Sequence, residues 1–211
     1  MTAYWSVPRE WERQTVFIVG GGPSVLGQDL DALRGRRVIA INSSVYAVPW
    51  ADILFFGDWR WHNEPDNKAA VASFAGRVVT TSRIVTDRKV LVCRKTDPPG
   101  LARERNSLMQ KRTSLTAATN LAAHLVGPGG TIIWLGADGR LAADGRTHHH
   151  KPHRWAHKPG CYDVQKADLV TIVPSLRMLG IAGYNASPGT AWADLLPAID
   201  LREALAERRA A

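Results

Sequence analysis

TVFIVGGGPS, residues 15–24, is the stretch that decides the fold, because an apolar run stops at three glycines, a proline and a serine. Residues 16–19 are predicted to form a buried strand, since they are four consecutive apolar residues, mostly β-branched, in front of a breaker. Successive glycines let the backbone turn sharply and approach a ligand closely, and the proline suits the first position of a following helix. Unpaired main-chain N–H groups at such a turn bind phosphate. The residues predicted to do so are Gly20, Gly21, Gly22, Pro23 and Ser24.

The same turn has a second interpretation, a tight connection between strand and helix that holds no ligand. Three successive glycines exceed what a turn alone requires, which favours a ligand. Two common motifs are excluded, because the stretch lacks the G-x-G-x-x-G of a dinucleotide site and the Gly-Lys-Ser/Thr ending of a Walker loop.

A second buried strand is predicted at Arg37–Ile41 (RVIAI), and leucines at helical spacing predict a helix over Val25–Leu33 between the two strands. Such a strand–helix–strand unit crosses over right-handed and brings both strand ends to the same edge of the sheet. Asn42 is therefore expected beside the glycine turn, where its amide would contact the ribose or base of a nucleotide, and Ser43 is assigned to the same site. The alternative is that Asn42 or Ser43 caps a helix.

The rest of the chain alternates buried strands with helices, which is typical of a mostly parallel sheet flanked by helices. We expect a single Rossmann-like α/β domain over residues 15–211, preceded by an N-terminal arm at 1–14. Residues 95–112 and 139–162 are predicted to be long loops over the site. Further strands are predicted at 53–56, 77–81, 89–93, 131–135 and 180–185, and further helices at 64–74, 113–126, 163–179 and 200–209. Basic residues of the first loop that would close over phosphates are Arg103, Arg105, Lys111 and Arg112.

Polar side chains follow three of these strands. Asp58 follows strand 53–56, Asp138 follows strand 131–135, and Asn185 ends the last strand, so we expect all of them at the ligand-binding edge. Asp58 is a candidate general base, and Asp58 with Asp138 would supply oxygen ligands for Mg²⁺. The alternative for Asp58 is the N-cap of the helix that follows it. Aromatic faces that would stack on a base or sugar are those of Trp59, Trp61 and His62.

Five of the seven histidines lie within residues 146–158. His148 and His150 are candidates for the general base, because imidazole accepts protons near neutral pH. A zinc site of His148, His150 and His153 is an alternative, although the spacing is irregular and no cysteines accompany it. A solvated basic loop is the remaining interpretation. His124 is predicted to lie at the surface, off the apolar face of its helix.

The amino-acid composition indicates which class of molecule the protein binds. A formal net charge of +8 and an isoelectric point near 9.9 favour an acidic partner such as a nucleotide, a nucleic acid or an anionic surface. A solvated basic surface is the alternative, because Lys and Arg are scattered along the chain. The two cysteines and the lack of a signal peptide predict a cytoplasmic location, and no apolar run approaches the roughly 20 residues that span a bilayer.

The order VGGGPS, AINSS, PWADILFFGD, TSLTAATNLAAHL, TIIWLGAD, DGRTHHH and NASPGT resembles one group of proteins. It is similar to the Rossmann-like domain of motility accessory factors, archaeal 6-hydroxymethylpterin diphosphokinases and small phage-encoded relatives, and to bacterial sialyltransferases that open with a Gly-x-Gly-Pro-Ser turn. The similarity covers residues 15–190. It implies that residues 21–24 hold the phosphate and sugar of a nucleotide and that Asn42 reaches the nucleotide or the acceptor. It also implies a histidine base, whose counterparts are His148 and His150, although the tyrosine-rich lid of the sialyltransferases is absent.

These observations predict a glycosyltransferase-like transferase whose donor is a nucleotide sugar. DNA or a nucleotide is one expected class of acceptor, and a phage-encoded origin would place the protein in the host cytoplasm. Two alternatives stay open, a magnesium-dependent pyrophosphokinase and a non-catalytic module that binds nucleic acid or an assembly.

Overall fold

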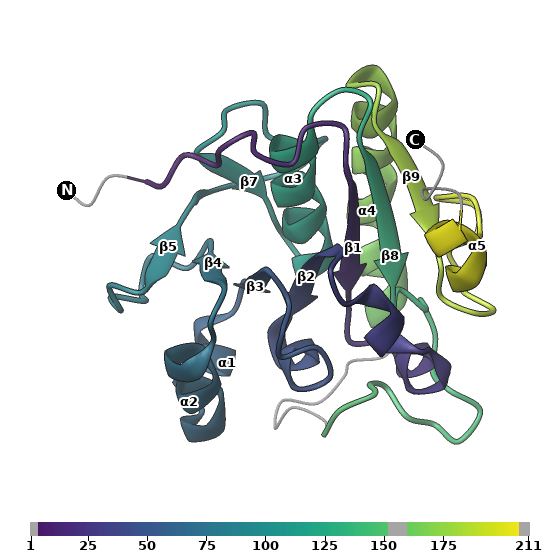
Figure 1. Ribbon diagram of the computed structural model, residues 1–211, viewed down its shortest axis with the longest axis horizontal. Coiled ribbons are helices and arrows are strands. Elements are labelled where there is room, and N and C mark those ends of the chain that lie inside the picture. Colours follow the sequence, from purple (N-terminus) through teal and green to yellow (C-terminus); the bar gives the residue numbers. More distant parts are fainter. Residues whose placement is uncertain (1–3, 152–159, 207–211) are drawn as a thin grey trace.

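Parallel strands form the centre of the protein, whose computed structural model describes residues 4–151 and 160–206. Within these residues, seven strands pair in the order β5-β4-β3-β2-β1-β8-β9, and every pairing is parallel (Figure 1). The predicted α/β fold with a Rossmann-like sheet is therefore confirmed. The strands are β1 (Thr15–Val19), β2 (Arg37–Ile41), β3 (Ile53–Phe56), β4 (Arg77–Thr80), β5 (Val90–Val92), β8 (Thr131–Leu135) and β9 (Ala182–Asn185).

The direction in which strands are added reverses at β1. From β1 the chain builds β2, β3, β4 and β5 outward to one edge, and it then returns to place β8 and β9 on the other side of β1. The carboxyl ends of the strands lie at the lower edge in Figure 1. Because the connections after β1 and β8 leave in opposite directions, a crevice opens between them, and ligands of open α/β sheets bind in such a crevice.

Helices cover the two faces of the sheet differently. Long helices cover one face, and short helices and 3₁₀ turns cover the other. Residues of one strand alternate between the two cores, so that Val16 and Ile18 pack with the long helices while Phe17 and Val19 pack with the short elements. The long helices are α3 (Ser114–Val126) and α4 (Cys161–Met178), and the short elements are η1 (Pro23–Gly27), η2 (Leu30–Leu33), η3 (Asn42–Tyr46), α1 (Trp59–Asn63), α2 (Pro65–Ser73) and α5 (Leu201–Ala206).

The described part of the N-terminal arm packs on the domain. Trp11 is buried in the core on the side of α3, and its main-chain N–H donates a hydrogen bond to the carbonyl oxygen of Leu125 at 3.1 Å. Nearer the start, the N–H of Trp5 donates to the carbonyl of Val92 at 2.8 Å, which joins the arm to β5. These contacts extend the core over one edge of the sheet.

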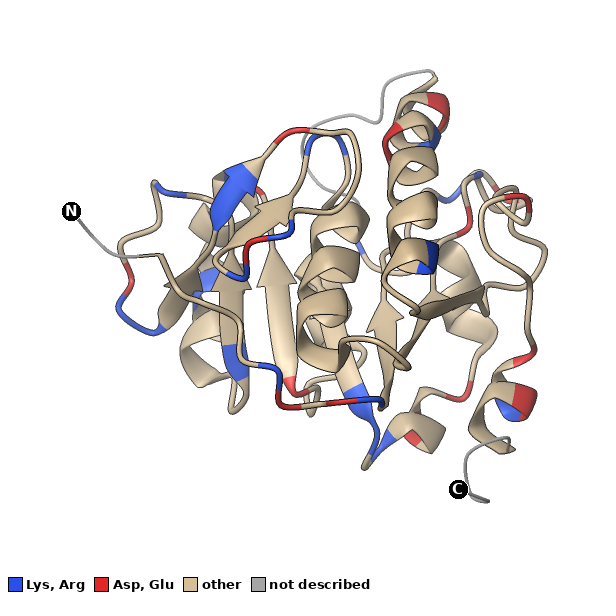
Figure 2. Ribbon diagram, turned by 90° about the horizontal axis from the view of Figure 1, so that it is seen from above, with Lys and Arg blue, Asp and Glu red and all other residues tan. Residues whose placement is uncertain are grey.

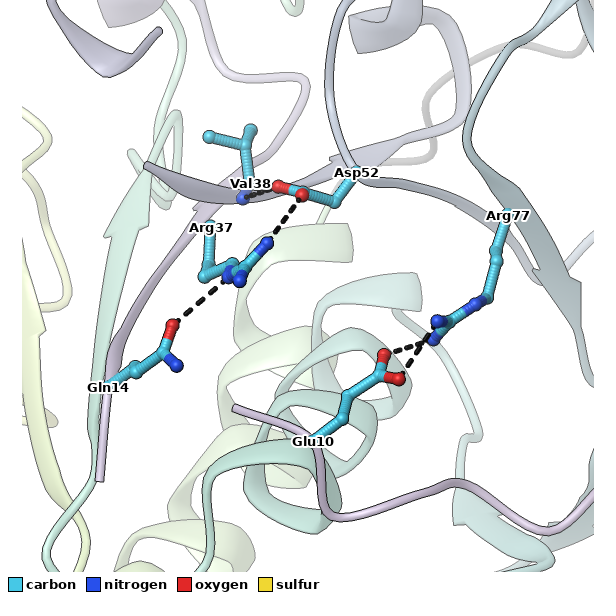
Figure 3. A network of polar contacts seen from close by, with 6 residues as sticks. All are labelled: Glu10, Gln14, Arg37, Val38, Asp52 and Arg77. Atoms are coloured by element: carbon cyan, nitrogen blue, oxygen red, sulfur yellow. Dashed lines mark hydrogen bonds and ion pairs between the residues drawn. The ribbon is translucent and has the colours of Figure 1, made fainter. Parts of the chain in front are cut away.

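Polar contacts also fasten the arm at the amino ends of the strands (Figure 3). Arg77 Nη2, at the start of β4, donates to Glu10 Oε2 at 2.9 Å. Arg37, at the start of β2, donates to Gln14 Oε1 at 3.0 Å and to Asp52 Oδ1 at 3.2 Å. The amino edge of the sheet is therefore occupied by structural contacts, while the opposite edge is left to the loops of the candidate site.

One predicted helix is wrong. Val25–Leu33 forms the two 3₁₀ turns η1 and η2 instead of a continuous helix, and Gln28 between them is extended, with φ −105° and ψ 141°. Leu33 is buried, but Leu26 is 56% exposed, so the leucine spacing does not describe one packed face. Gly27 beside Gln28 accounts for the break, because glycine lowers helix propensity by about 1 kcal/mol.

Two further predictions need correction. Residues 95–112 are not an unbroken loop, since β6 (Arg94–Thr96) and β7 (Ser107–Met109) pair as a small parallel sheet. Strands of three residues are too short to leave a periodic signal. His124 is buried rather than at the surface: its Nε2 lies 3.0 Å from the carbonyl oxygen of Ser107, the first residue of β7, and burial lowers its pKa.

Of the helices within residues 4–151 and 160–206, none combines the length and the apolar character that a bilayer span requires.

Candidate functional site

A cleft of about 1410 Å³ lies at the carboxyl edge of the sheet, over the ends of β1, β2, β3 and β8. It includes the point between β1 and β8 where strand order reverses, which is the expected place for a ligand. The structure brings most of the sequence-predicted residues together there: Gly20, Gly21, Gly22, Asn42, Asp58, Asp138, His148 and His150. It leaves four of them outside the lining: Pro23, Ser24, Ser43 and Asn185.

The glycine turn packs against the loop after β8. The N–H of Gly20 donates to Leu135 O at 2.8 Å, and the N–H of Gly22 donates to Gly136 O at 2.9 Å. A Cβ atom at Gly22 would lie 2.5 Å from Gly136 O, closer than real Cβ atoms come to an oxygen. Close approach of two backbone segments therefore accounts for these glycines, and only Gly21 leaves its N–H without a partner among the described residues.

The N-terminal end of η1 is occupied by a carboxylate of the protein itself. The N–H of Ser24 donates to Asp138 Oδ2 at 2.8 Å, and the Ser24 hydroxyl donates to Asp138 Oδ1. Asp138 is only 5% exposed. The prediction that Pro23 and Ser24 open a helix with free N–H groups for phosphate is therefore wrong, because η1 is a short 3₁₀ turn and Asp138 occupies its positive end.

Asn42 is placed as predicted, at the end of β2 and in the lining of the cleft. Its φ of 51° is uncommon for a residue other than glycine, and such strain concentrates at functional sites. Its Oδ1 is buried and accepts no hydrogen bond from any residue that the structure describes. Since a buried acceptor without a partner costs about 1–3 kcal/mol, a donor group of a ligand would stabilise this position.

Ser43 and Asn185 serve the protein's own structure. Ser43 Oγ accepts a hydrogen bond from Trp61 Nε1 at 2.8 Å. Asn185 donates from Nδ2 to Ala137 O at 3.1 Å, and its Oδ1 accepts from the N–H of Ser187 at 3.0 Å. Both side chains are buried, so their assignment to nucleotide binding is not supported by where the structure places them.

Asp58 caps the short helix α1. Its Oδ1 accepts from the N–H of Arg60 at 2.9 Å, and its Oδ2 pairs with Arg60 Nη2 at 2.5 Å. Asp58 and Asp138 follow β3 and β8, which are three interstrand spacings apart, or about 14 Å. Each carboxylate is already engaged by the protein, Asp58 by Arg60 and Asp138 by Ser24, so the structure does not support their joint use as magnesium ligands.

The histidine loop, residues 147–151, docks on the glycine turn through His149. The N–H of His149 donates to Gly21 O at 3.0 Å, and its Nε2 lies 3.1 Å from Ser44 Oγ. The hydroxyl of Ser44 has one proton, which it donates to Gly20 O at 2.9 Å. In its contact with Ser44, His149 Nε2 must therefore be the donor. Burial, with a smaller effect of His150, lowers the pKa of His149 to about 4.

His148 and His150 lie directly over Gly21, with ring centroids 4.8 Å apart. A Cβ atom at Gly21 would come within 2.9 Å of His148 Cδ2 and 3.3 Å of His150 Nε2, so the missing side chain makes room for both rings. His150 Nδ1 donates to Lys151 O at 2.9 Å, which puts the lone pair on Nε2. Burial also lowers the pKa of His150, so a neutral imidazole faces the cleft at pH 7. His153, the third residue of the zinc hypothesis, lies outside the described residues.

Replacement of His149 by glutamine is expected to flatten the dependence of stability on pH. In the folded protein the pKa of His149 is about 4, below the 6.5 of an unfolded histidine, so the unfolded chain binds the proton first. Stability is therefore lost as the pH falls from 6.5 toward 4, by about 1 kcal/mol at pH 5 after allowance for solvent screening. Thermal unfolding at pH 7.5 and 5.0 measures the difference. An equal loss in both proteins would show that His149 is not the titrating group.

Positive charge exceeds negative charge around the cleft. The described lining holds the cations Arg60, Lys95, Lys111, Arg112, Arg140 and Arg146, and the carboxylates Asp58, Asp138 and Asp144. Of these six lining cations, Lys95, Lys111 and Arg140 make no ion pair with any residue that the structure describes. Elsewhere, Lys and Arg are spread over the molecule rather than gathered on one face (Figure 2).

Two long helices also begin at the cleft. The first residues of α3 and α4 line it, and Thr113 Oγ1 caps the N–H of Leu115 at 3.2 Å. Each helix carries about half a positive charge at its N-terminus. Arg112, just before α3, is held by the buried carboxylate of Asp168 in α4, with Nη1 and Oδ1 2.8 Å apart. Of the loop cations predicted to close over phosphates, Lys111 and Arg112 line the cleft. Arg105 does not, and donates instead to Val7 O at 2.7 Å.

The fold and the cleft together define a class, an α/β protein with a cleft where the strand order of its parallel sheet reverses. Comparison of the chain with models of protein families and with curated protein sequences finds no match.

Proposed function

We propose that the protein is a transferase that binds a nucleotide-activated donor, with a sugar as the activated group, in the cleft between β1 and β8. The observation that carries the proposal is the convergence of the N-termini of α3 and α4 and of Arg140 on a crevice at the reversal of strand order. Helix N-termini and an arginine without an ion pair in the described chain are suited to the phosphates of a nucleotide.

Other residues of the same cleft lining are suited to the ribose, the base and the phosphates of the donor. Asn42 Oδ1, a buried acceptor, would accept a hydrogen bond from a ribose hydroxyl or a base amino group. Arg140 sits on the β8 side of the cleft, and its guanidinium passes over Gly189, where a Cβ atom would lie only 2.6 Å from Nη2. Gly189 therefore leaves room for the arginine to reach the cleft.

The reaction would be a displacement at the sugar carbon that bears the nucleotide. The acceptor oxygen forms a bond to that carbon while the bond from the carbon to the phosphate oxygen breaks, and the electron pair leaves with the phosphate. Arg140 and the helix N-termini stabilise the charge on the departing phosphate. The acceptor proton passes to Nε2 of His150, because Nδ1 of that ring already donates to Lys151 O, whereas both carboxylate oxygens of Asp58 are engaged by Arg60.

A panel of nucleotides in a thermal-shift assay tests the proposal. CMP, UDP, GDP and ATP, and sugar conjugates of the first three, are compared with and without magnesium. A ligand at a hundred times its dissociation constant adds about 2.7 kcal/mol, which raises Tm by roughly 5–11 °C for a chain of this size. A shift with a sugar nucleotide that needs no magnesium supports the transferase. Shifts confined to ATP with magnesium would favour the pyrophosphokinase, and no shift with any compound would refute both.

Alkylation of Cys161 is expected to slow at least tenfold when the nucleotide binds. Cys161 begins α4 and lines the cleft, and partial burial raises its pKa, whereas Cys93 is fully buried with its pKa raised to about 12, so Cys161 is the more reactive of the two cysteines. Mass spectrometry after timed exposure to iodoacetamide at pH 8.5 measures the rate. Cys161→Ser serves as the control and should take up no label. An unchanged rate with a nucleotide that raises Tm would mean that the nucleotide binds elsewhere.

A further inference from the structure

A second pocket, of about 520 Å³, lies between the helices after β3 and the connection from β4 to β5. Its volume falls within the range of small-ligand sites. Trp59 lines both this pocket and the main cleft, so the two spaces meet at this residue. The residues that give the second pocket its chemistry are Trp59, His62, Asn63, Lys68, Ile84 and Asp87.

The second pocket is uncharged overall and has exposed apolar walls. Its lining carries one ammonium group, Lys68, and one carboxylate, Asp87, and burial lowers the pKa of His62 so that its ring is neutral at pH 7. Trp59 is 43% exposed and Ile84 is 67% exposed. A flat ring with polar edges fits such a pocket, because it can stack on the indole while amide and imidazole groups contact its edge.

The walls of this pocket are held in place. His62 stacks on Phe56, the last residue of β3, with ring centroids 5.1 Å apart. Lys89 Nζ donates to the carbonyl oxygens of Ala72 and Phe74 at 2.7 Å each, which ties the connection between β4 and β5 to the end of α2. The pocket therefore exists without rearrangement of the fold.

Two cations stand on the cleft side of Trp59. The side chain of Gln110 presses on Gly57, two residues before Trp59, since a Cβ atom at Gly57 would overlap the Gln110 amide. The N–H of Gln110 donates to Thr96 O at 3.0 Å. Lys111 follows Gln110 in the chain, and Lys95 precedes Thr96. Both lysines line the cleft and make no ion pair in the described chain. A neutral aromatic pocket thus adjoins a positively charged rim.

We propose that single-stranded nucleic acid binds here, with one base stacked on Trp59 in the second pocket and the adjacent phosphates on Lys95 and Lys111. A charged groove for the backbone next to an aromatic platform for a base is how proteins hold single strands without reading sequence. That this strand is the acceptor of the transfer reaction rests on the proposed function. Its binding to the protein does not. The arrangement also separates the charges, because Arg140 on the β8 side serves the donor and the two lysines on the β3 side serve the strand.

Fluorescence anisotropy with a labelled 12-nucleotide oligothymidylate and with the matching duplex tests the proposal. We expect the single strand to bind more tightly, Trp59→Ala to weaken it about tenfold, and Trp59→Phe to retain most of the affinity. The double variant Lys95→Ala, Lys111→Ala should reduce the slope of log affinity against log salt by about 1.4, since each neutralised contact contributes about 0.7.

Matched controls lie elsewhere on the molecule. Trp50 stacks with Arg34 before the start of β3, at the edge opposite Trp59, so Trp50→Ala should leave the affinity unchanged. Arg177→Ala, near the C-terminal end of α4, removes one charge far from the cleft. It should leave the slope of log affinity against log salt within about 0.2 of the wild-type slope. Wild-type protein that binds no oligonucleotide at low salt, or binds polyglutamate equally well, would overturn the proposal, as would an unchanged affinity of Trp59→Ala.

The nucleotide and oligonucleotide experiments together distinguish the transferase proposal from the single-strand proposal. Nucleotide-induced thermal shifts without oligonucleotide binding would remove the single strand and leave the transferase standing. Oligonucleotide binding that depends on Trp59, without any nucleotide-induced shift, would support the strand site and refute the transferase.

Discussion

Replacement of Gly22 by alanine is expected to lower the free energy of unfolding by about 3 kcal/mol, or roughly 6–12 °C in Tm. The backbone of Gly22 has φ −64° and ψ 150°, which alanine adopts without strain, so the cost arises only from contacts. The new Cβ would lie 2.5 Å from Gly136 O and 2.6 Å from Asp138 Oδ2. Neither group can withdraw cheaply, because one is backbone and the other holds Ser24 through two hydrogen bonds.

Gly27→Ala is the matched control for this prediction. Gly27 lies five residues on, in the same 3₁₀ turn, and no atom lies within 4 Å of the position that its Cβ would take. Its replacement should change stability by less than about 1 kcal/mol, because only the entropy of the unfolded chain is affected. Chemical denaturation of both variants gives the comparison. Equal stability of the two variants would contradict the close packing of the turns after β1 and β8.

Replacement of Arg140 by alanine is expected to weaken binding of the donor nucleotide by about 10–100-fold. A hydrogen bond between charged groups contributes about 1.5–3 kcal/mol, and Arg140 has no carboxylate partner in the described chain that would offset its charge. Arg140 is exposed at the mouth of the cleft, so the fold should lose little stability. Isothermal titration with the best nucleotide of the thermal-shift panel measures the loss.

Arg177→Ala controls for the change in net charge. It removes the same unit charge from the last turn of α4, whose 18 residues place it about 25 Å from the start of that helix at the cleft. Nucleotide affinity should then stay within about twofold of wild type at physiological salt, because charges beyond the Debye length are screened. A comparable loss in both variants would assign the effect to overall charge, and no loss for Arg140→Ala would remove this residue from the donor site.

Much of the sheet could be predicted because buried parallel strands leave a local signal. TVFIV, RVIAI and TIIWL are largely apolar runs followed by glycine or asparagine; the last two form β2 and β8 over the predicted residues, and β1 begins one residue before the predicted 16–19. The helix predicted at 113–126 is α3, and Thr113, which precedes its apolar pattern, caps the N–H of Leu115. These features depend on neighbours within a few positions.

The contents of the site were only partly predictable. Placing Asn42, Asp58 and Asp138 at one edge follows from the direction of parallel strands, and all three line the cleft. The partner of each side chain did not follow, because Ser24 and Asp138 are 114 positions apart. Likewise His149, the histidine that anchors its loop, carries no local mark that separates it from its two neighbours.

The sequence by itself determined the strands of the large sheet, their direction and the edge at which the candidate ligand-binding groups collect, because apolar periodicity and turn-forming residues act over short stretches of chain. Only the tertiary structure decided strand order, the pairing of β6 with β7, the occupation of the first turn by Asp138, and the burial of His124 and His149. Those outcomes depend on which distant segments pack together, and packing is a property of the whole chain rather than of any window within it.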